Sequence, residues 1–204
     1  MVSKSRKQAL VVLGLVLLLI IAIALISAFW PKAEQQFIEL GLLGKDGTAT
    51  EYYSNDNPTI TSGTQINWFI YTHNQMSGSQ YITVKVKLLN SAMQAPNDNE
   101  NEPSPYASID EFPVFLHVNG TQLIPFSWSI LDAVSQNDSI VINSLLINGQ
   151  TVNVNPSVAS TSSFCMVFEL WVYNQSSQEY SFGWDSGNGI HSASVTMWFN
   201  MNLS

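Results

Sequence analysis

The chain has 204 residues, a formal net charge of −8, only 11% charged residues and a single cysteine. An acidic chain lacks the basic surface that neutralises phosphates, which excludes a nucleic-acid-binding function. One cysteine excludes an internal disulfide. Neutral Ser, Thr, Asn and Gln side chains supply the polarity instead of charged ones, which suits an acidic exterior because their polarity persists when carboxylates become protonated.

The first predicted element is an uncharged apolar helix over residues 9–30. About 20 helical residues span a hydrocarbon core roughly 30 Å thick, so we predict a single-pass transmembrane helix. Residues 1–8 form a cytoplasmic basic tail by the positive-inside rule, which places residues 31–204 in an extracytoplasmic domain at the cell membrane. The basic residues concerned are Lys4, Arg6 and Lys7.

Two alternatives to a retained anchor stay open. Ser27 and Ala28 resemble the small-residue site of a cleaved signal peptide, although the apolar run exceeds the roughly 7–15 residues of such signals. The layout also resembles, coarsely, an archaeal type IV pilin, whose apolar helix packs in a filament core. The sequence Lys7-Gln8-Ala9 differs from the processing site of such pilins.

The segment that follows has four basic and fifteen acidic residues, a formal charge of 4 − 15 = −11. Its hydrophobic pattern has the period of two that is typical of strands. Residues 81–89 alternate apolar with polar side chains, and residues 65–73 are rich in aromatic and β-branched types. Residues 163–173 are apolar on both faces and predict a covered central strand, and residues 193–203 predict the last strand.

Turn signals separate these runs. Asn119-Gly120 and Asn148-Gly149 each stand between two apolar runs and predict type I′ hairpins. Residues 45–47 predict the turn of a first hairpin, and residues 127–136 are compatible with one short helix. The fold class is therefore mainly β: an N-terminal transmembrane α-helix followed by an antiparallel β-sandwich, Ig-like.

Residues 90–111 predict a long loop between strands, because they combine three prolines with many acidic and amide residues. Carboxylate oxygens suit Ca²⁺, so the loop offers a weak candidate calcium site, with a solvated, mobile acidic loop as the alternative. The carboxylates concerned are Asp98, Glu100, Glu102, Asp110 and Glu111.

Other candidate metal and catalytic residues match no known pattern closely. The chain order of a blue-copper site is present, but 26 positions separate its cysteine from the second histidine, so we predict core packing for Cys165. The three histidines fit no zinc spacing, and no G-x-S-x-G elbow occurs. We therefore predict no catalytic residue, metal or cofactor. The copper ligands considered are His117, Cys165, His191 and Met197, and the remaining histidine is His73.

Glu169 lies among apolar residues of the predicted central strand, so we expect its carboxyl to be desolvated. An edge position or an ion pair with Lys85 or Lys87 is the commoner arrangement, and a glycosidase-type partnership with Asp110 or Glu111 stays open. Four N-x-S/T triplets are candidate glycosylation sites: Asn119, Asn137, Asn174 and Asn202.

Residues 37–74 resemble the start of the extracytoplasmic β-domain of an archaeal membrane family known as domain of unknown function 1616. The family pattern F-x-E-L-x-(L/I)-L-G-x-D-G is matched here, and residues 168–173 and 195–201 are similar to its closing strands. The resemblance implies the fold and the location, and no catalytic residue. The matching residues are Phe37, Glu39, Leu40, Leu43, Gly44, Asp46, Gly47 and Tyr53.

These observations predict a non-catalytic accessory or interaction subunit of a membrane or cell-envelope complex, in contact with the lipid bilayer and other envelope proteins or copies of itself. The alternative is a subunit of a surface filament, pilin-like or completed by the strand 195–203. An extracytoplasmic metal, redox or hydrolytic protein is the weakest hypothesis. Five tryptophans exceed the usual need of one core and predict a docking patch: Trp68, Trp128, Trp171, Trp184 and Trp198.

Overall fold

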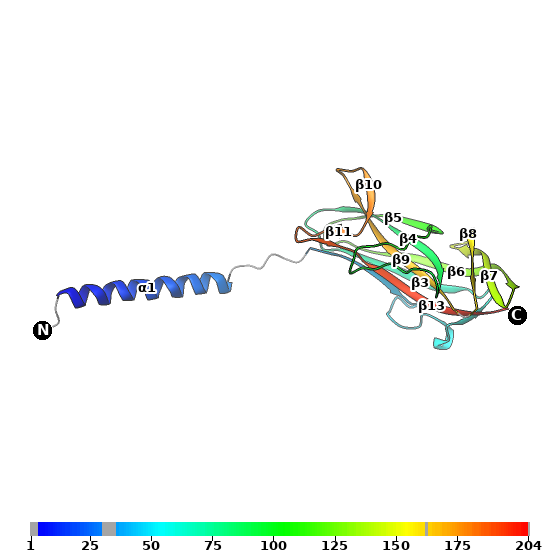
Figure 1. Cartoon of the computed structure of the whole chain (residues 1–204), viewed down its shortest axis with the longest axis horizontal. Helices are drawn as coiled ribbons and strands as arrows, with labels where there is room; N and C mark the ends of the chain where they lie inside the picture. Colours follow the sequence, from blue (N-terminus) through cyan, green and yellow to red (C-terminus); the bar gives the residue numbers. More distant parts are fainter. Residues whose placement is uncertain (1–3, 30–35, 162, 204) are drawn as a thin grey trace. The chain divides into compact units, whose positions relative to one another are not determined.

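The computed structural model describes residues 4–29, 36–161 and 163–203. The chain forms two units, Met1–Glu34 and Gln35–Ser204, the first helical and the second built of strands (Figure 1).

The helical unit contains α1 (Lys4–Phe29), so the apolar run does form a helix. Within the described residues, no helix is both long and apolar enough to cross a membrane. This finding contradicts the single-pass membrane localisation predicted above, which counted residues 9–30 as one continuous span.

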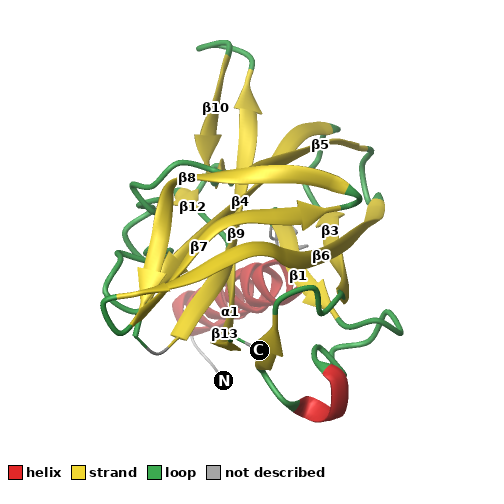
Figure 2. Cartoon of the chain, turned by 90° about the vertical axis from the view of Figure 1, so that its right-hand side faces the viewer, coloured by secondary structure: helices red, strands yellow, loops and turns green. Residues whose placement is uncertain are grey.

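The second unit is a β-sandwich of two mainly antiparallel sheets (Figure 2), which confirms the predicted fold class at that level. The first sheet has the order β1 (Ile38–Leu43), β3 (Ile66–Asn74), β6 (Thr121–Gln136), β7 (Ser139–Ile147) and β8 (Gln150–Ser160). The second has the order β2 (Thr59–Thr61), β13 (Ser194–Asn202), β9 (Ser163–Asn174), β4 (Gln80–Asn90) and β5 (Asp110–Leu116).

Four short elements complete the domain. The first is the 3₁₀ turn η1 (Ser54–Asp56), and the second is the strand β10 (Glu179–Phe182), which pairs with β9. The other two, β11 (Trp184–Asp185) and β12 (Ile190–His191), form a two-stranded ribbon. The β9–β10 hairpin projects beyond the stacked layers (Figure 2).

Aromatic rings from both sheets fill the core between them. Trp68 of β3 contacts the rings of Phe126 and Trp128 of β6, and across the sandwich the ring of Phe168 of β9 at 6.2 Å between centroids. All four side chains are at most 1% exposed. Because strand side chains alternate between faces, this packing fixes which residues of β9 and β4 point away from the core.

The turn signals are confirmed in part. Asn148 and Gly149, with φ of 46° and 82°, form the predicted hairpin turn between β7 and β8. The predicted hairpin at Asn119-Gly120 is wrong: the tight turn exists, but β5 pairs with β4 while β6 pairs with β3. The turn is a corner between the two sheets, held by Asn74, whose Nδ2 donates to the carbonyl of His117 at 3.0 Å.

Two further local predictions are corrected. The turn at residues 45–47 is present, but β1 pairs with β3 instead of with the segment that follows the turn. Residues 127–136 lie in β6 and form no helix, because they pair with β7 over most of their length.

Candidate binding cleft

The long loop between β4 and β5 crosses the outer face of the second sheet, where a buried ion pair holds it. Lys87 Nζ lies 2.8 Å from Glu169 Oε2, and the two residues are 3% and 0% exposed. Ser104, in the loop, accepts from Lys87 Nζ through its carbonyl at 2.6 Å and donates its N–H to Glu169 Oε1 at 2.7 Å. These contacts explain why β9 is covered on both faces, as its sequence predicts.

A second contact fixes the loop at its acidic part. Asp98 Oδ2 accepts from the backbone N–H of Ser194 at 3.1 Å and from its hydroxyl at 2.9 Å. Asp98 also accepts from the hydroxyl of Ser192 at 3.2 Å through its carbonyl. The loop is therefore attached to β13 as well as to β4 and β9.

Trp171 of β9 is the central aromatic residue of this face. Its Nε1 donates to Glu169 Oε2 at 3.0 Å, and Lys85 Nζ lies 4.0 Å from the centre of its ring. The Phe182 ring is 6.0 Å away, tilted by 54°. The buried ion pair thus orients Trp171 before any ligand arrives.

Gly183 allows the chain to turn from β10 into β11. Its φ is 88°, and a Cβ built there would lie 2.0 Å from the carbonyl oxygen of His191. Its N–H donates to the carbonyl of Leu170 at 3.1 Å. The close approach of β12 to the backbone at residue 183 therefore requires a glycine here.

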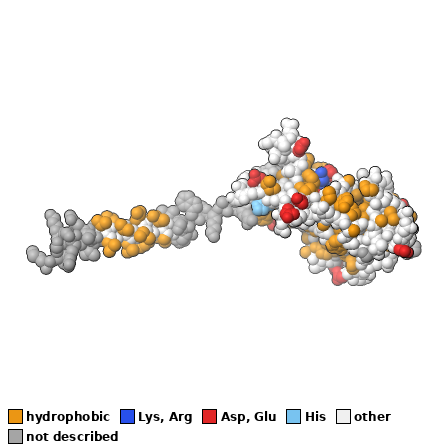
Figure 3. Space-filling view, in the orientation of Figure 1, with side chains coloured by type: hydrophobic (Ala, Val, Ile, Leu, Met, Phe, Trp, Pro, Cys, Tyr) orange, Lys and Arg blue, Asp and Glu red, His pale blue; other side chains and the backbone are white. Residues whose placement is uncertain are grey.

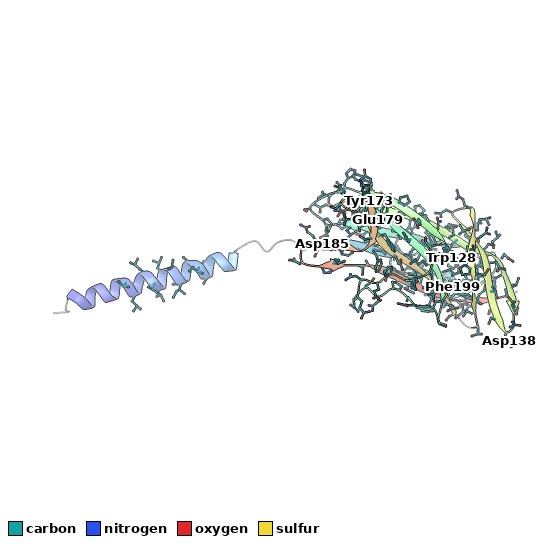
Figure 4. All side chains as sticks on the ribbon, turned by 45° about the horizontal axis from the view of Figure 1, so that its top comes forward. Trp128, Asp138, Tyr173, Glu179, Asp185 and Phe199 are labelled. Carbon is teal, nitrogen blue, oxygen red and sulfur yellow. The ribbon has the colours of Figure 1, made fainter. Side chains whose placement is uncertain are left out.

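The loop, β9, β10 and the ribbon enclose a cleft of about 460 Å³. A smaller cavity of about 180 Å³ shares five lining residues with it: Asn174, Ser181, Gly183, Trp184 and Asp185. Figure 4 marks Asp185, Tyr173 and Glu179 at this end of the domain and Asp138 at the other. The cleft is lined by Asn101, Pro103, Trp171, Asn174, Ser181, Phe182, Gly183, Trp184, Asp185 and Ile190.

Two polar atoms of the lining are buried without a hydrogen-bond partner among the described residues. They are Trp184 Nε1, a donor, and Asn101 Oδ1, an acceptor. Trp184 is 9% exposed and lies beside the His191 ring, 6.0 Å between centroids. A buried polar group without a partner costs about 1–3 kcal/mol. Both atoms have almost no accessible surface, so a molecule in the cleft does not reach them in this arrangement.

The lining is otherwise neutral. Asp185 is its one charged residue, and no Lys or Arg lines the cleft as described. Basic side chains occupy only a small area of the face of the domain drawn in Figure 3. The arrangement can thus bind apolar surface against aromatic rings and exchange a few hydrogen bonds, without attracting anions.

The structure spreads the carboxylates of the predicted calcium site over separate contacts. Asp98 binds β13, Glu100 accepts from Asn97 Nδ2 at 2.7 Å, and Glu102 pairs with Asn97 through the backbone. Glu111 lies 3.7 Å from Lys85 Nζ. In the described part of the chain, no group of three His, Cys, Asp or Glu side chains is placed to hold a metal ion.

Asp110 begins β5, where burial raises the pKa of its carboxyl. The backbone N–H of Glu111, which donates to Asp110 Oδ1 at 2.9 Å, opposes that shift.

The four residues of the copper pattern do not form one site. Cys165 pairs with Trp198 on the outer face of the second sheet, whereas the adjacent Met197 points toward the core. Burial raises the pKa of the Cys165 thiol to about 12, so the thiolate is scarce. His117 lies at the corner between the sheets and His191 in β12, while His73 of β3 hydrogen-bonds Thr121 at 2.8 Å.

The four candidate glycosylation asparagines are all exposed. Asn174 also lines the cleft, and its Oδ1 accepts from the N–H groups of Ser176 and Ser177 at 2.8 and 3.3 Å. The other three are Asn119, in the corner between β5 and β6, Asn137, between β6 and β7, and Asn202, at the end of β13.

The tryptophans of the predicted docking patch separate into three groups. Trp68 and Trp128 are core residues at 1% exposure, and Trp198 is 46% exposed on β13. Trp171 and Trp184 line the cleft. Sequence reasoning named these two residues but missed Asn101, a loop residue with a positive φ of 55° that no sequence motif marks.

Searches with known families give no assignment. No family model matches the chain, and no curated protein does. The resemblance to domain of unknown function 1616 therefore stays a prediction.

Solved structures similar to the chain are distant. The metal-bound CARDB domain of the PF1109 protein from Pyrococcus furiosus matches at 7% identity and a TM-score of 0.40, over 85% of this chain and all of that domain. Spo0M, a sporulation control protein from Bacillus subtilis, matches at 11% and 0.35, over 83% of this chain and 50% of its own length. The DNA glycosylase AlkC from Pseudomonas fluorescens matches at 15% and 0.28, over 61% of this chain and 29% of that one. Scores this low carry no argument about function.

Proposed function

We propose that this protein is a non-catalytic interaction module, an accessory subunit that binds its partner through the cleft between the long loop, β9 and the β11–β12 ribbon. The observation that carries the proposal is a cleft of about 460 Å³ lined by three aromatic side chains, Trp171, Phe182 and Trp184, of which Trp171 is fixed by its hydrogen bond to the buried Glu169.

Rigidity supports a binding role. Trp171 is fixed by its hydrogen bond to Glu169, and the loop that brings Asn101 and Pro103 to the cleft is held by Ser104. A site that is ordered before binding loses less conformational entropy when the ligand arrives, which improves affinity. The cleft therefore needs little rearrangement to bind.

We also propose that the sandwich is of the Ig-like type. Two sheets whose neighbouring strands are antiparallel, apart from β2 beside β13, and a chain that changes sheet between β5 and β6 support this finer description.

In-cell photo-crosslinking tests the proposal. A photoreactive phenylalanine analogue replaces Ile190, which is 62% exposed at the rim of the cleft, in the full chain expressed in its source organism. The matched control carries the analogue at Leu131 of β6, which is 51% exposed and does not line the cleft.

We expect a discrete adduct from position 190 and none from position 131, because only the first lies beside the cleft. The same adduct from both positions, or none from either, contradicts the proposal.

A further inference from the structure

We propose that Asn188 is a site of spontaneous covalent modification, at which its peptide bond to Gly189 is converted into an isoaspartyl bond. The inference is independent of the proposed function, because it concerns a reaction of the chain with water. The same dipeptide occurs three times, and the structure leaves only the third copy free to react. The three pairs are Asn119-Gly120, Asn148-Gly149 and Asn188-Gly189.

The reaction is a ring closure followed by hydrolysis. The backbone nitrogen of the glycine loses its proton and attacks the side-chain carbonyl carbon of the asparagine. A C–N bond forms, and the side-chain amide group takes up a proton and leaves as ammonia. Water then adds to either carbonyl carbon of the succinimide ring and opens it. The product is aspartate or isoaspartate, in which the main chain runs through the former side chain.

Glycine favours this reaction because it has no Cβ to shield its nitrogen or to restrict its backbone. In a folded chain two further conditions apply. The side-chain amide of the asparagine has to turn toward the glycine, and the glycine nitrogen has to be free of other contacts. Hydrogen bonds to either group therefore protect an Asn-Gly pair.

Asn148 is protected through its side chain. Its Oδ1 accepts from the N–H of Ser127 at 2.8 Å, and its Nδ2 donates to the carbonyl of Pro125 at 3.0 Å. Ring closure at this position breaks both hydrogen bonds before the amide can reach Gly149. The loss of two hydrogen bonds lowers the reactive population by about ten-fold or more.

Asn119 is protected through the glycine that follows it. The N–H of Gly120, which is the attacking group, donates to the carbonyl of His117 at 2.9 Å. The carbonyl of Gly120 accepts from the N–H of Asn74 at 2.9 Å, so the backbone of this corner is held on both sides of the glycine. Attack from this nitrogen requires the corner to open.

Asn188 has neither protection. It is exposed in the turn between β11 and β12, where its N–H donates to Ser186 Oγ at 3.3 Å and the carbonyl of Gly189 accepts from the N–H of Ser186 at 3.1 Å. These bonds involve neither of the reacting groups. Among the described residues, the side-chain amide of Asn188 and the N–H of Gly189 have no hydrogen-bond partner.

The product changes the turn beside the cleft. The turn joins Asp185 to Ile190, which pair across the ribbon and both line the cleft. Each product carries a carboxylate in place of the neutral amide of Asn188, and the isoaspartyl form lengthens the main chain by one methylene. The ribbon therefore gains a negative charge and, in the isoaspartyl form, a longer turn.

The test is peptide mapping of the full chain after storage in mildly alkaline buffer, in the folded state and in concentrated guanidinium chloride. All seven Lys and Arg residues lie at or before position 87, so chymotrypsin replaces trypsin. Its cleavage at aromatic residues places the three pairs in separate peptides. Mass spectrometry detects the gain of about 1 Da on deamidation, and chromatography separates aspartyl from isoaspartyl peptides.

Two controls accompany the measurement. The denatured chain contains the same three dipeptides without the protecting hydrogen bonds, so it reports what the local sequence alone contributes. Asn188→Gln keeps an exposed amide but closes the ring far more slowly, because the ring would need six members. Its peptide from residues 185–198 identifies the signal that belongs to Asn188.

In the folded chain we expect Asn188 to be deamidated at least about ten-fold faster than Asn119 or Asn148. In guanidinium chloride we expect rates of the same order at all three positions, and Asn188→Gln removes the mass gain from its peptide. Equal rates at the three positions in the folded chain overturn the inference. A preference for Asn188 that is as large in the denatured chain also overturns it, because the local sequence would then set the rate.

Discussion

Glu169 is the residue on which the covered face of the second sheet depends. It is fully buried and accepts from Lys87, Ser104 and Trp171. The alternation of β4 predicts that Lys85 and Lys87 share a face with it, but strand periodicity alone cannot choose between the two. The loop that buries Lys87 decides the choice, and the loop path is not a local property of the sequence.

Removing one partner of this pair leaves a buried charge without compensation. We expect Lys87→Met to lower the free energy of unfolding by about 3–5 kcal/mol, measured by urea denaturation. The double substitution Lys87→Met/Glu169→Gln removes both charges and keeps an acceptor, so it recovers a large part of the loss. A Lys87→Met variant within about 0.5 kcal/mol of the wild type is incompatible with this account.

Asp110 gives a prediction for pH. Burial raises the pKa of its carboxyl in the folded state, so the folded state holds the proton more tightly than the unfolded state does. The charged carboxylate therefore costs stability above the folded pKa, and that cost disappears as pH falls below the ordinary value of 3.8.

Asp110→Asn keeps the acceptor for the Glu111 N–H and removes the charge. We expect its melting temperature to exceed that of the wild type at pH 7, with the difference vanishing near pH 3. An equal or lower melting temperature at pH 7 contradicts the desolvation argument.

At the scale of elements, turn chemistry was predictable and strand pairing was not. Asn148-Gly149 connects neighbouring strands, so a local signal sufficed. The same dipeptide at Asn119-Gly120 turns a corner between sheets, because Asn74 of β3 holds the turn and β5 pairs with β4. The residues that decide between a hairpin and a corner lie far away in the sequence.

Gly183 tests how the ribbon is built. Gly183→Ala combines a left-handed φ with a Cβ at 2.0 Å from the His191 carbonyl oxygen, so we expect a loss of about 2–4 kcal/mol in the free energy of unfolding. The control is Gly149→Ala, which has a similar φ of 82° and nothing within 4 Å of the new Cβ. That variant should lose only about 1 kcal/mol, and equal losses from both argue against the close approach.

At the scale of the molecule, the sandwich followed from strand periodicity and turns, while the cleft did not. Its lining comes from the long loop, β9, β10 and the ribbon. The acidic composition of the loop suggested a metal site, yet its ordering depends on Ser104, an unremarkable residue in sequence. The tryptophan excess was the one signal that pointed to this end of the domain.

The sandwich forms a compact unit of its own, Gln35–Ser204, with its core between its two sheets. We expect this segment, expressed alone, to unfold in a single cooperative transition in urea, with near-ultraviolet circular dichroism and fluorescence giving the same midpoint. Different midpoints for the two probes would mean that a partly folded intermediate is populated, which contradicts a single cooperative unit.

The most direct test of the binding cleft is the indole ¹⁵N–¹H spectrum of the full chain during titration with whole-cell extract from its source organism. The account predicts that the Trp184 and Trp171 signals shift together. Trp68, whose Nε1 already donates to the Tyr52 carbonyl in the core, serves as the internal reference and stays unchanged. Unchanged cleft signals, or shifts confined to Trp198, contradict the account.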